Sequence, residues 1–306
     1  QYDPNEIPSR FSQLATDNAN SPLLNRATQS TYPPGSAFKV VTAAAALDTG
    51  KFTPDSIVDG SSPQRISGVP LSNCCTEGSG DFGPIPLAVA LQRSVNTAFA
   101  NVAVELGQDT LVEYMKRFGF YKDPPLDYPD AQMAPSGIFN GDGDLVEDGF
   151  DVGRAAIGQG GAEGQTRATV LQMALVAAAI GNGGVMMEPR LVERIVSPDG
   201  RVRERFRPRR LRRVVKEETA RQLAAMMRGV VQSGTAAGTG LDAFDAAGKT
   251  GTAEVQGGAA NQAWFIAFAP AEDPKVAIAV TVERTQGQGA SVAAPIARQV
   301  LAEILG

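Results

Sequence analysis

The sequence predicts an α+β fold in which a mainly antiparallel sheet lies beside a helical lobe. Two observations lead to this expectation. Helical patterns fill the middle of the chain, and strand patterns cluster in its last third. The 306 residues, of which 43% are hydrophobic and 20% charged, can bury a substantial core.

The first predicted helix begins at Ser36 and runs to Leu47. Alanine, the strongest helix former, dominates this stretch, and Gly50 is a plausible stop. Further helical patterns follow at Leu87–Leu106, Thr110–Phe118, Ala168–Ile180, Glu217–Val231 and Ala293–Leu305. The stretches 51–83 and 121–152 are rich in turn-forming residues and are predicted to be irregular.

Strand signals appear after residue 190. The runs Leu191–Val196 and Val202–Phe206 flank a turn sequence at Asp199 and predict a hairpin. Ala263–Phe268 and Val276–Val282 predict two further strands of the sheet. Eight arginines between residues 201 and 213 favour a solvated edge strand, and a polyanion site is the alternative.

Composition excludes several classes of function. The formal net charge of -5 argues against a nucleic-acid partner. No run approaches the ~18 apolar residues of a membrane helix. The chain has no histidine, which removes Ser-His-Asp hydrolysis, Cys-His proteolysis and His-ligated zinc. We expect no metal and no cofactor.

Two local features are interpreted as structural and not as functional sites. Cys74 and Cys75 are adjacent, which suits neither a zinc site nor a redox motif, and leaves open two thiols or a vicinal disulfide. Asn140, Asp142 and Asp144 faintly resemble a calcium loop, but the glycine that such a loop needs is missing. We interpret that segment as a surface loop.

The first candidate for chemistry is the pair Ser36 and Lys39. Residues three apart share one face of a helix, so the hydroxyl and the amine can come within hydrogen-bonding distance. A serine needs a base to become a nucleophile. Without histidine, a lysine whose pKa is lowered by burial and by a nearby cation is the natural candidate.

The second candidate is Ser94-Val95-Asn96. A serine and an amide two residues apart, at a helix start or in a loop, can relay a proton and hold a substrate amide. Taken by itself, the same pattern also suits an ordinary helix cap.

The third candidate is the run of Lys249, Thr250, Gly251 and Thr252. A phosphate-binding loop would need a glycine at position 243, which is Ala243. We therefore interpret the run as a strand in which Gly251 lets a ligand backbone lie alongside. The lysine charge and the threonine hydroxyls suit a substrate carboxylate.

Together the three runs form the pattern S-x-x-K, S-x-N and K-T-G, at Ser36, Ser94 and Lys249. At these residues the chain resembles the transpeptidase domain of class B penicillin-binding proteins. The similarity extends along the whole chain, in the segments 25–27, 32–39, 157–160, 171–174 and 263–265. The resemblance implies the fold shared by penicillin-binding proteins and serine β-lactamases.

The resemblance also implies an activity, which is the cross-linking of peptidoglycan stem peptides through a serine acyl-enzyme that β-lactams also form. Ser36 would attack the D-Ala-D-Ala carbonyl and Lys39 would take the serine proton. Ser94 would relay that proton to the leaving amine. Asn96 would bind the side chain of the acyl donor.

The remaining implied roles concern the strand residues. Lys249, Thr250 and Thr252 would hold the terminal carboxylate of the substrate. The backbone amides of Ser36 and Thr252 would form the oxyanion hole. An amine from a second peptide strand would then take the acyl group.

The chain departs from the family pattern at two positions. The middle motif has Val95 where class A β-lactamases carry aspartate, and Gln262 stands where many relatives carry histidine. We expect residues 1–306 to form one transpeptidase domain. We also expect its first sheet strand and a membrane anchor to lie outside this sequence, and the domain to work on the extracytoplasmic face of the membrane.

Two alternatives share the same motifs. One is a hydrolase, either a β-lactamase or a D-alanine carboxypeptidase, and the other is a β-lactam sensor without catalytic turnover. Cell-wall or division proteins are expected as partners of a transpeptidase.

Overall fold

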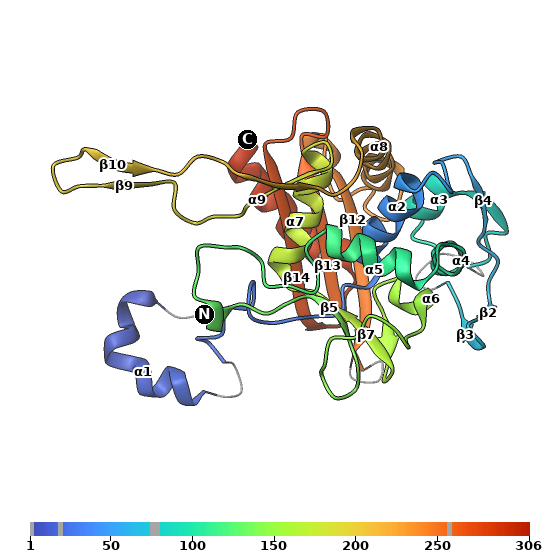
Figure 1. Cartoon of the computed structure of the whole chain (residues 1–306), viewed down its shortest axis with the longest axis horizontal. Helices are drawn as coiled ribbons and strands as arrows, with labels where there is room; N and C mark the ends of the chain where they lie inside the picture. Colours follow the sequence, from blue (N-terminus) through green and yellow to red (C-terminus); the bar gives the residue numbers. More distant parts are fainter. Residues whose placement is uncertain (1–2, 18–20, 74–79, 256–258) are drawn as a thin grey trace.

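A three-stranded antiparallel sheet forms the centre of the computed structural model, which describes residues 3–17, 21–73, 80–255 and 259–306 (Figure 1). Its order is β12 (Ala247–Val255), β13 (Ala260–Ala269) and β14 (Val276–Thr285). The two strands expected from the sequence lie inside β13 and β14, and the lysine-threonine run lies in β12. The α+β class is confirmed.

Three helices pack against this sheet. These are α7 (Val170–Gly181), α8 (Glu217–Ser233) and α9 (Ala294–Leu305). Helix α8 contacts β12, whereas α7 and α9 contact β13 and β14. All three helices were expected from helical patterns in the sequence, with ends displaced by at most two residues.

A second group of helices forms the lobe beside the sheet. It comprises α2 (Lys39–Asp48), α3 (Leu87–Gln92), α4 (Asn96–Leu106), α5 (Gln108–Arg117) and α6 (Val152–Ala155). The expected single helix over 87–106 is wrong, because a turn with Ser94 at φ 61 separates α3 from α4. The expected helix start at Ser36 is a 3-10 turn, Gly35–Phe38, that precedes α2.

The stretches expected to be irregular contain short strands. They are β1 (Ile57–Asp59), β2 (Gln64–Ile66), β3 (Val69–Leu71) and β5 (Gly137–Phe139), while β4 (Pro84–Pro86) follows directly after the first of these stretches. Further short strands are β6 (Gly160–Gly161), β7 (Gly164–Arg167), β8 (Val185–Met187) and β11 (Arg210–Arg213). Helix α1 (Ile7–Thr16) lies near the N-terminus. Cys74 and Cys75 fall outside the described residues.

The predicted hairpin consists of β9 (Arg194–Val196) and β10 (Val202–Arg205), which pair only with each other in the described structure. Figure 1 shows it projecting far from the sheet. Every residue of both strands is exposed, as expected for solvated arginine-rich strands. The last arginines of the run form β11, which pairs with β8.

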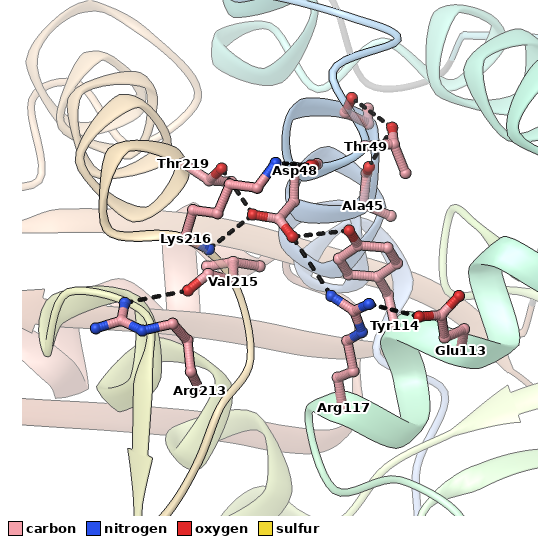
Figure 2. A network of polar contacts seen from close by, with 11 residues as sticks. Ala45, Asp48, Thr49, Glu113, Tyr114, Arg117, Arg213, Val215, Lys216 and Thr219 are labelled. Atoms are coloured by element: carbon pink, nitrogen blue, oxygen red, sulfur yellow. Dashed lines mark hydrogen bonds and ion pairs between the residues drawn. The ribbon is translucent and has the colours of Figure 1, made fainter.

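A buried carboxylate joins three of the helices (Figure 2). Asp48, at the end of α2, accepts hydrogen bonds from Tyr114 Oη of α5 at 2.8 Å and from Thr219 Oγ1 of α8 at 2.8 Å. It also accepts the backbone N–H of Lys216 at 2.7 Å, immediately before α8. The C-terminal end of α2, the helix that follows Ser36, is thereby linked to α5 in the helical lobe and to α8 beside the sheet.

No helix among the described residues is long and apolar enough to cross a membrane.

Candidate active site

Ser36 lies in a 3-10 turn that is pressed against β12. Gly35 has φ 51, and its amide donates to the Gly158 carbonyl at 3.0 Å. A Cβ on Gly35 would lie 2.5 Å from the backbone oxygen of Thr252, closer than real contacts allow. Only glycine fits here, and its absent side chain lets the turn place Ser36 beside the strand.

Lys39 is fully buried, and three oxygens lie closest to its amine. Nζ lies 3.0 Å from Ser36 Oγ, 2.6 Å from the Ser94 carbonyl oxygen and 2.7 Å from Asn96 Oδ1. The carbonyl and the amide oxygen can only accept, so they take up two N–H bonds. A neutral amine then keeps its lone pair for the Ser36 hydroxyl, and can accept the proton of that hydroxyl.

Ser94 sits between two lysines. Its left-handed backbone, at φ 61, places the carbonyl oxygen against Lys39, while Ser94 Oγ lies 2.9 Å from Lys249 Nζ and 3.4 Å from Lys39 Nζ. Such backbone strain in a residue other than glycine persists only where its surroundings enforce it. The hydroxyl therefore bridges the two amines and can pass a proton between them.

Asn96 is the first residue of α4 and is buried. Its Oδ1 accepts from Lys39, and its Nδ2 donates to the Ser72 carbonyl at 3.1 Å. Both ends of the amide thus have partners within the protein, and one of them orients the Lys39 amine. The sequence suggested contact with substrate for this residue, but not this contact with Lys39.

Lys249 projects from β12 toward Ser94 and is fully buried. Its Nζ donates to Ser94 Oγ and to the Thr250 carbonyl at 3.0 Å. Burial lowers the pKa of Lys249 to about 7, because the charged form loses its hydration. At neutral pH the amine is therefore close to its midpoint, and an arriving carboxylate would draw it to the charged form.

The neighbouring strand residues are held by the protein itself. Thr250 Oγ1 lies 2.6 Å from Thr235 Oγ1, and Thr252 Oγ1 accepts the Gly289 N–H at 3.2 Å. Gly251 was expected to make room for a ligand backbone. The structure corrects this reason: a Cβ there would lie 2.6 Å from the Pro34 carbonyl oxygen, so the glycine makes room for the segment leading to Ser36.

Sequence reasoning assigned no supporting role to two residues, although one of them lies in the segment 157–160 that resembles the family. Gly158, at φ 72, receives the Gly35 amide, and a Cβ on it would meet the Gly35 carbonyl oxygen at 2.1 Å. Thr235 follows α8 and bonds Thr250, and no sequence signal marked it. Gln262 is buried on β13 and donates to Thr281 Oγ1 at 2.6 Å.

Within the part of the chain that the structure describes, no three Asp, Glu or Cys side chains gather as metal ligands. The faint calcium-like loop is a turn in which Asn140 Oδ1 accepts the backbone amides of Asp142 and Asp144 at 3.0 and 2.8 Å. This arrangement agrees with a surface loop.

Comparisons with known proteins place this geometry in a family. Residues 1–302 match the penicillin-binding protein transpeptidase domain. The peptidoglycan D,D-transpeptidase PbpA of Mycolicibacterium smegmatis is 37% identical over 94% of this chain and 58% of its own length. The PbpA of Mycobacterium tuberculosis is 35% identical over 98% of this chain and 62% of its own length. The chain thus spans about three fifths of these relatives.

Solved structures agree. The imipenem acyl-enzyme of penicillin-binding protein A from M. tuberculosis superposes with a TM-score of 0.83 at 32% identity, covering 100% of this chain and 67% of that one. The D,D-transpeptidase domain from Eggerthella lenta gives 0.84 at 32% identity, covering 98% and 72%. On the sequence match and the shared fold, this chain belongs to the family of penicillin-binding protein transpeptidase domains.

Proposed function

We propose that residues 1–306 form one D,D-transpeptidase domain that cross-links peptidoglycan stem peptides through a serine acyl-enzyme and is acylated by β-lactams. One observation carries the proposal. The hydroxyls of Ser36 and Ser94 and the amines of Lys39 and Lys249 form a continuous chain of contacts of 2.9–3.4 Å. Relatives named D,D-transpeptidases and acyl-enzyme structures of a relative with imipenem and penicillin G support it.

In the first half-reaction Ser36 Oγ attacks the carbonyl of the penultimate D-Ala. Lys39 Nζ accepts the hydroxyl proton as the C–O bond forms, which general-base assistance accelerates by about 10²–10⁴-fold. The proton then passes through Ser94 Oγ to the leaving amine, and terminal D-Ala departs as the C–N bond breaks. The backbone amides of Ser36 and Thr252 stabilise the oxyanion.

Substrate recognition rests on the strand. Lys249, in its charged form, pairs with the terminal carboxylate, together with the hydroxyls of Thr250 and Thr252. Gly251 keeps the strand against the Ser36 turn. Asn96 contacts the donor peptide and holds Lys39 in place.

In the second half-reaction an amine from another stem peptide attacks the ester. Lys39 accepts one proton of that amine and returns it to Ser36 Oγ as the ester C–O bond breaks, so that Ser36 is regenerated and a new amide joins the two peptides. A β-lactam enters through the first half-reaction only, because its opened ring remains attached and blocks the acceptor. We propose that this happens on the outer face of the cell membrane, with cell-wall or division proteins as partners.

Intact-mass spectrometry after incubation with penicillin G tests the acylation. The protein mass should increase by one penicillin molecule, and Ser36→Ala should abolish the increase. Ser12→Ala, an exposed serine of α1, is the matched control and should acylate like the parent chain. An unchanged mass of the parent protein would refute the proposal.

Acyl-enzyme lifetime and product analysis separate the alternatives. A transpeptidase should hold a fluorescent penicillin for minutes to hours and should form a dimeric product from a peptide donor and an amine acceptor. Rapid turnover of the penicillin would indicate a β-lactamase. Acylation without any cross-linked or hydrolysed peptide would indicate a sensor.

A further inference from the structure

A cavity lies beside the segment that leads to Ser36. It has a volume of about 590 Å³ and is bounded by the segment 21–33 and by the ends of β7, β12, β13 and β14. Ligand sites usually measure about 300–1,000 Å³, whereas one water takes about 30 Å³. The cavity is therefore large enough for several residues of a peptide.

The acidic group of this cavity already has partners. Glu283 Oε1 accepts a hydrogen bond from Tyr32 Oη and lies 3.1 Å from Arg26 Nε. Burial, reinforced by the hydrogen bond to Glu283, raises the pKa of Tyr32 to about 12. The tyrosine therefore keeps its proton at physiological pH and donates it to the carboxylate. One carboxylate is thus shared by a guanidinium and a phenol.

Two further guanidiniums line the cavity. Arg167 donates to the Thr31 carbonyl at 3.0 Å and stacks over the Phe139 ring at 6.0 Å, which holds it in place. Arg284 follows Glu283, where the register between β13 and β14 shifts, and its backbone is left-handed at φ 50. In the described part of the chain neither Arg167 nor Arg284 has a carboxylate partner.

This bulge explains how the cavity acquires its charge. A β-bulge bends a strand and re-aims its side chains, and strained backbone in a residue other than glycine gathers at functional sites. Here the bulge lets Glu283 face Tyr32 while Arg284 lines the same cavity. Three guanidiniums and one carboxylate then line the cavity, in a chain whose net charge is -5. Leu24, Pro33 and Val255 add apolar lining.

We propose that this cavity is a second binding site, for a carboxylate-bearing segment of a cell-wall stem peptide. The excess of arginine charge over carboxylate charge favours an anionic ligand. The apolar lining and the volume suit a peptide better than a small ion. Pro33 is three residues before Ser36, at most about 11 Å along the chain. A peptide bound here lies beside the one that reacts. The inference rests on the proposed function and extends it.

Isothermal titration calorimetry on penicillin-acylated protein tests the site, because the Ser36 position is then filled. The probe is the tripeptide L-Ala-γ-D-Glu-L-Lys, which carries carboxylates but no D-Ala-D-Ala end. Its amidated form, without carboxylates, is the matched control ligand. We expect saturable binding of one tripeptide, and at least tenfold weaker binding of the amidated form.

Arg284→Gln and Arg167→Gln should each weaken tripeptide binding about tenfold, since each removes one charge-assisted hydrogen-bond donor. Arg203→Gln, on the remote hairpin β9–β10, removes the same charge and should leave the affinity unchanged. Thermal melting of each variant confirms that it is folded. Equal losses in all three variants would overturn the proposal, because they would indicate general attraction to positive charge.

Two further outcomes would also overturn it: no heat of binding with the acylated protein, or binding of inorganic phosphate but not of the tripeptide. The mass spectrum of the same sample reports acylation separately. Failure of the proposed function appears as an unshifted mass. Failure of this inference appears as absent binding to protein whose mass has shifted.

Discussion

Replacing Asp48 by alanine removes the carboxylate that joins α2, α5 and α8 (Figure 2). Asp48 is only 5% exposed, so water cannot replace the lost bonds in full. Three donors lose their acceptor: Tyr114 Oη, the Lys216 amide and Thr219 Oγ1. Arg117 Nη1, which lies 3.4 Å from Asp48 Oδ2, loses its nearest buried charge.

The magnitude follows from those contacts. An unsatisfied buried donor costs about 1–3 kcal/mol, and breaking a buried charged pair costs about 3–5 kcal/mol. Because Arg117 and Lys216 are partly exposed and can recover water, we expect the lower part of the combined range. The free energy of unfolding should fall by about 3–5 kcal/mol in Asp48→Ala, among the largest effects of a single substitution.

The pH dependence supplies a second signature. Burial alone raises the pKa of Asp48, but hydrogen bonds from the Lys216 amide, Tyr114 and Thr219 outweigh it and lower the pKa below its usual value. The stabilisation is therefore present above the unfolded pKa of about 3.9 and is lost as pH falls through the lower folded value. The difference between the parent chain and Asp48→Asn should shrink between pH 4 and pH 2.

Urea unfolding at pH 7, with the same titration repeated at low pH, measures both effects. Asp199→Ala, at the exposed tip of the hairpin, is the matched control and should change stability by less than about 0.5 kcal/mol. If Asp48→Ala lowered the free energy of unfolding by less than about 1 kcal/mol, this would refute the reasoning that these buried bonds hold α2, α5 and α8 together.

Three further predictions concern the active site. Lys39→Ala should slow acylation by penicillin about 10²–10⁴-fold, while the exposed Lys51→Ala should not; a wild-type rate would rule out the lysine as base. Because the pKa of Lys249 is about 7, its charged fraction falls above that pH. The dissociation constant of noncovalent penicillin binding to Ser36→Ala should therefore rise about tenfold per unit above pH 8, and a flat profile from pH 6 to 9 would contradict this. Gly251→Ala should destabilise the fold by about 1–3 kcal/mol and slow acylation, because its Cβ would meet the Pro34 carbonyl oxygen at 2.6 Å; Gly229→Ala, with open space around it on α8, should not destabilise, and equal melting temperatures for the two would disprove the clash.

Much of the chemistry was readable in the sequence. The absence of histidine and the spacing of Ser36 and Lys39 predicted a serine-lysine pair, and the structure places their side chains 3.0 Å apart. Local patterns were enough here because residues three apart on a helical turn meet without help from the rest of the fold. Helices α7, α8 and α9 followed for a similar reason, since helix-forming composition is a property of the segment itself.

Other features depended on partners far away in the chain. The break at Ser94 was predicted only in part: Ser94-Val95-Asn96 was expected at a helix start or in a loop, but 87–106 also reads as one helix. The oxygens of Ser94 face lysines that lie 55 and 155 residues away. The reason for Gly251 also required the fold, because its missing side chain faces the Pro34 carbonyl. The same holds for Asp48, whose bonds to Lys216 and Thr219 span 168 and 171 residues.

The sequence by itself thus determined which groups can react, since nucleophile, base and cation are set by residue type and short spacing. The tertiary structure decided what surrounds them: which oxygens contact the Lys39 amine, how far burial lowers the pKa of Lys249, and which cavity Arg167 and Arg284 both line. Side chains lose water and come into close contact only when distant segments pack together. A local sequence pattern does not specify which distant residues this packing brings into contact.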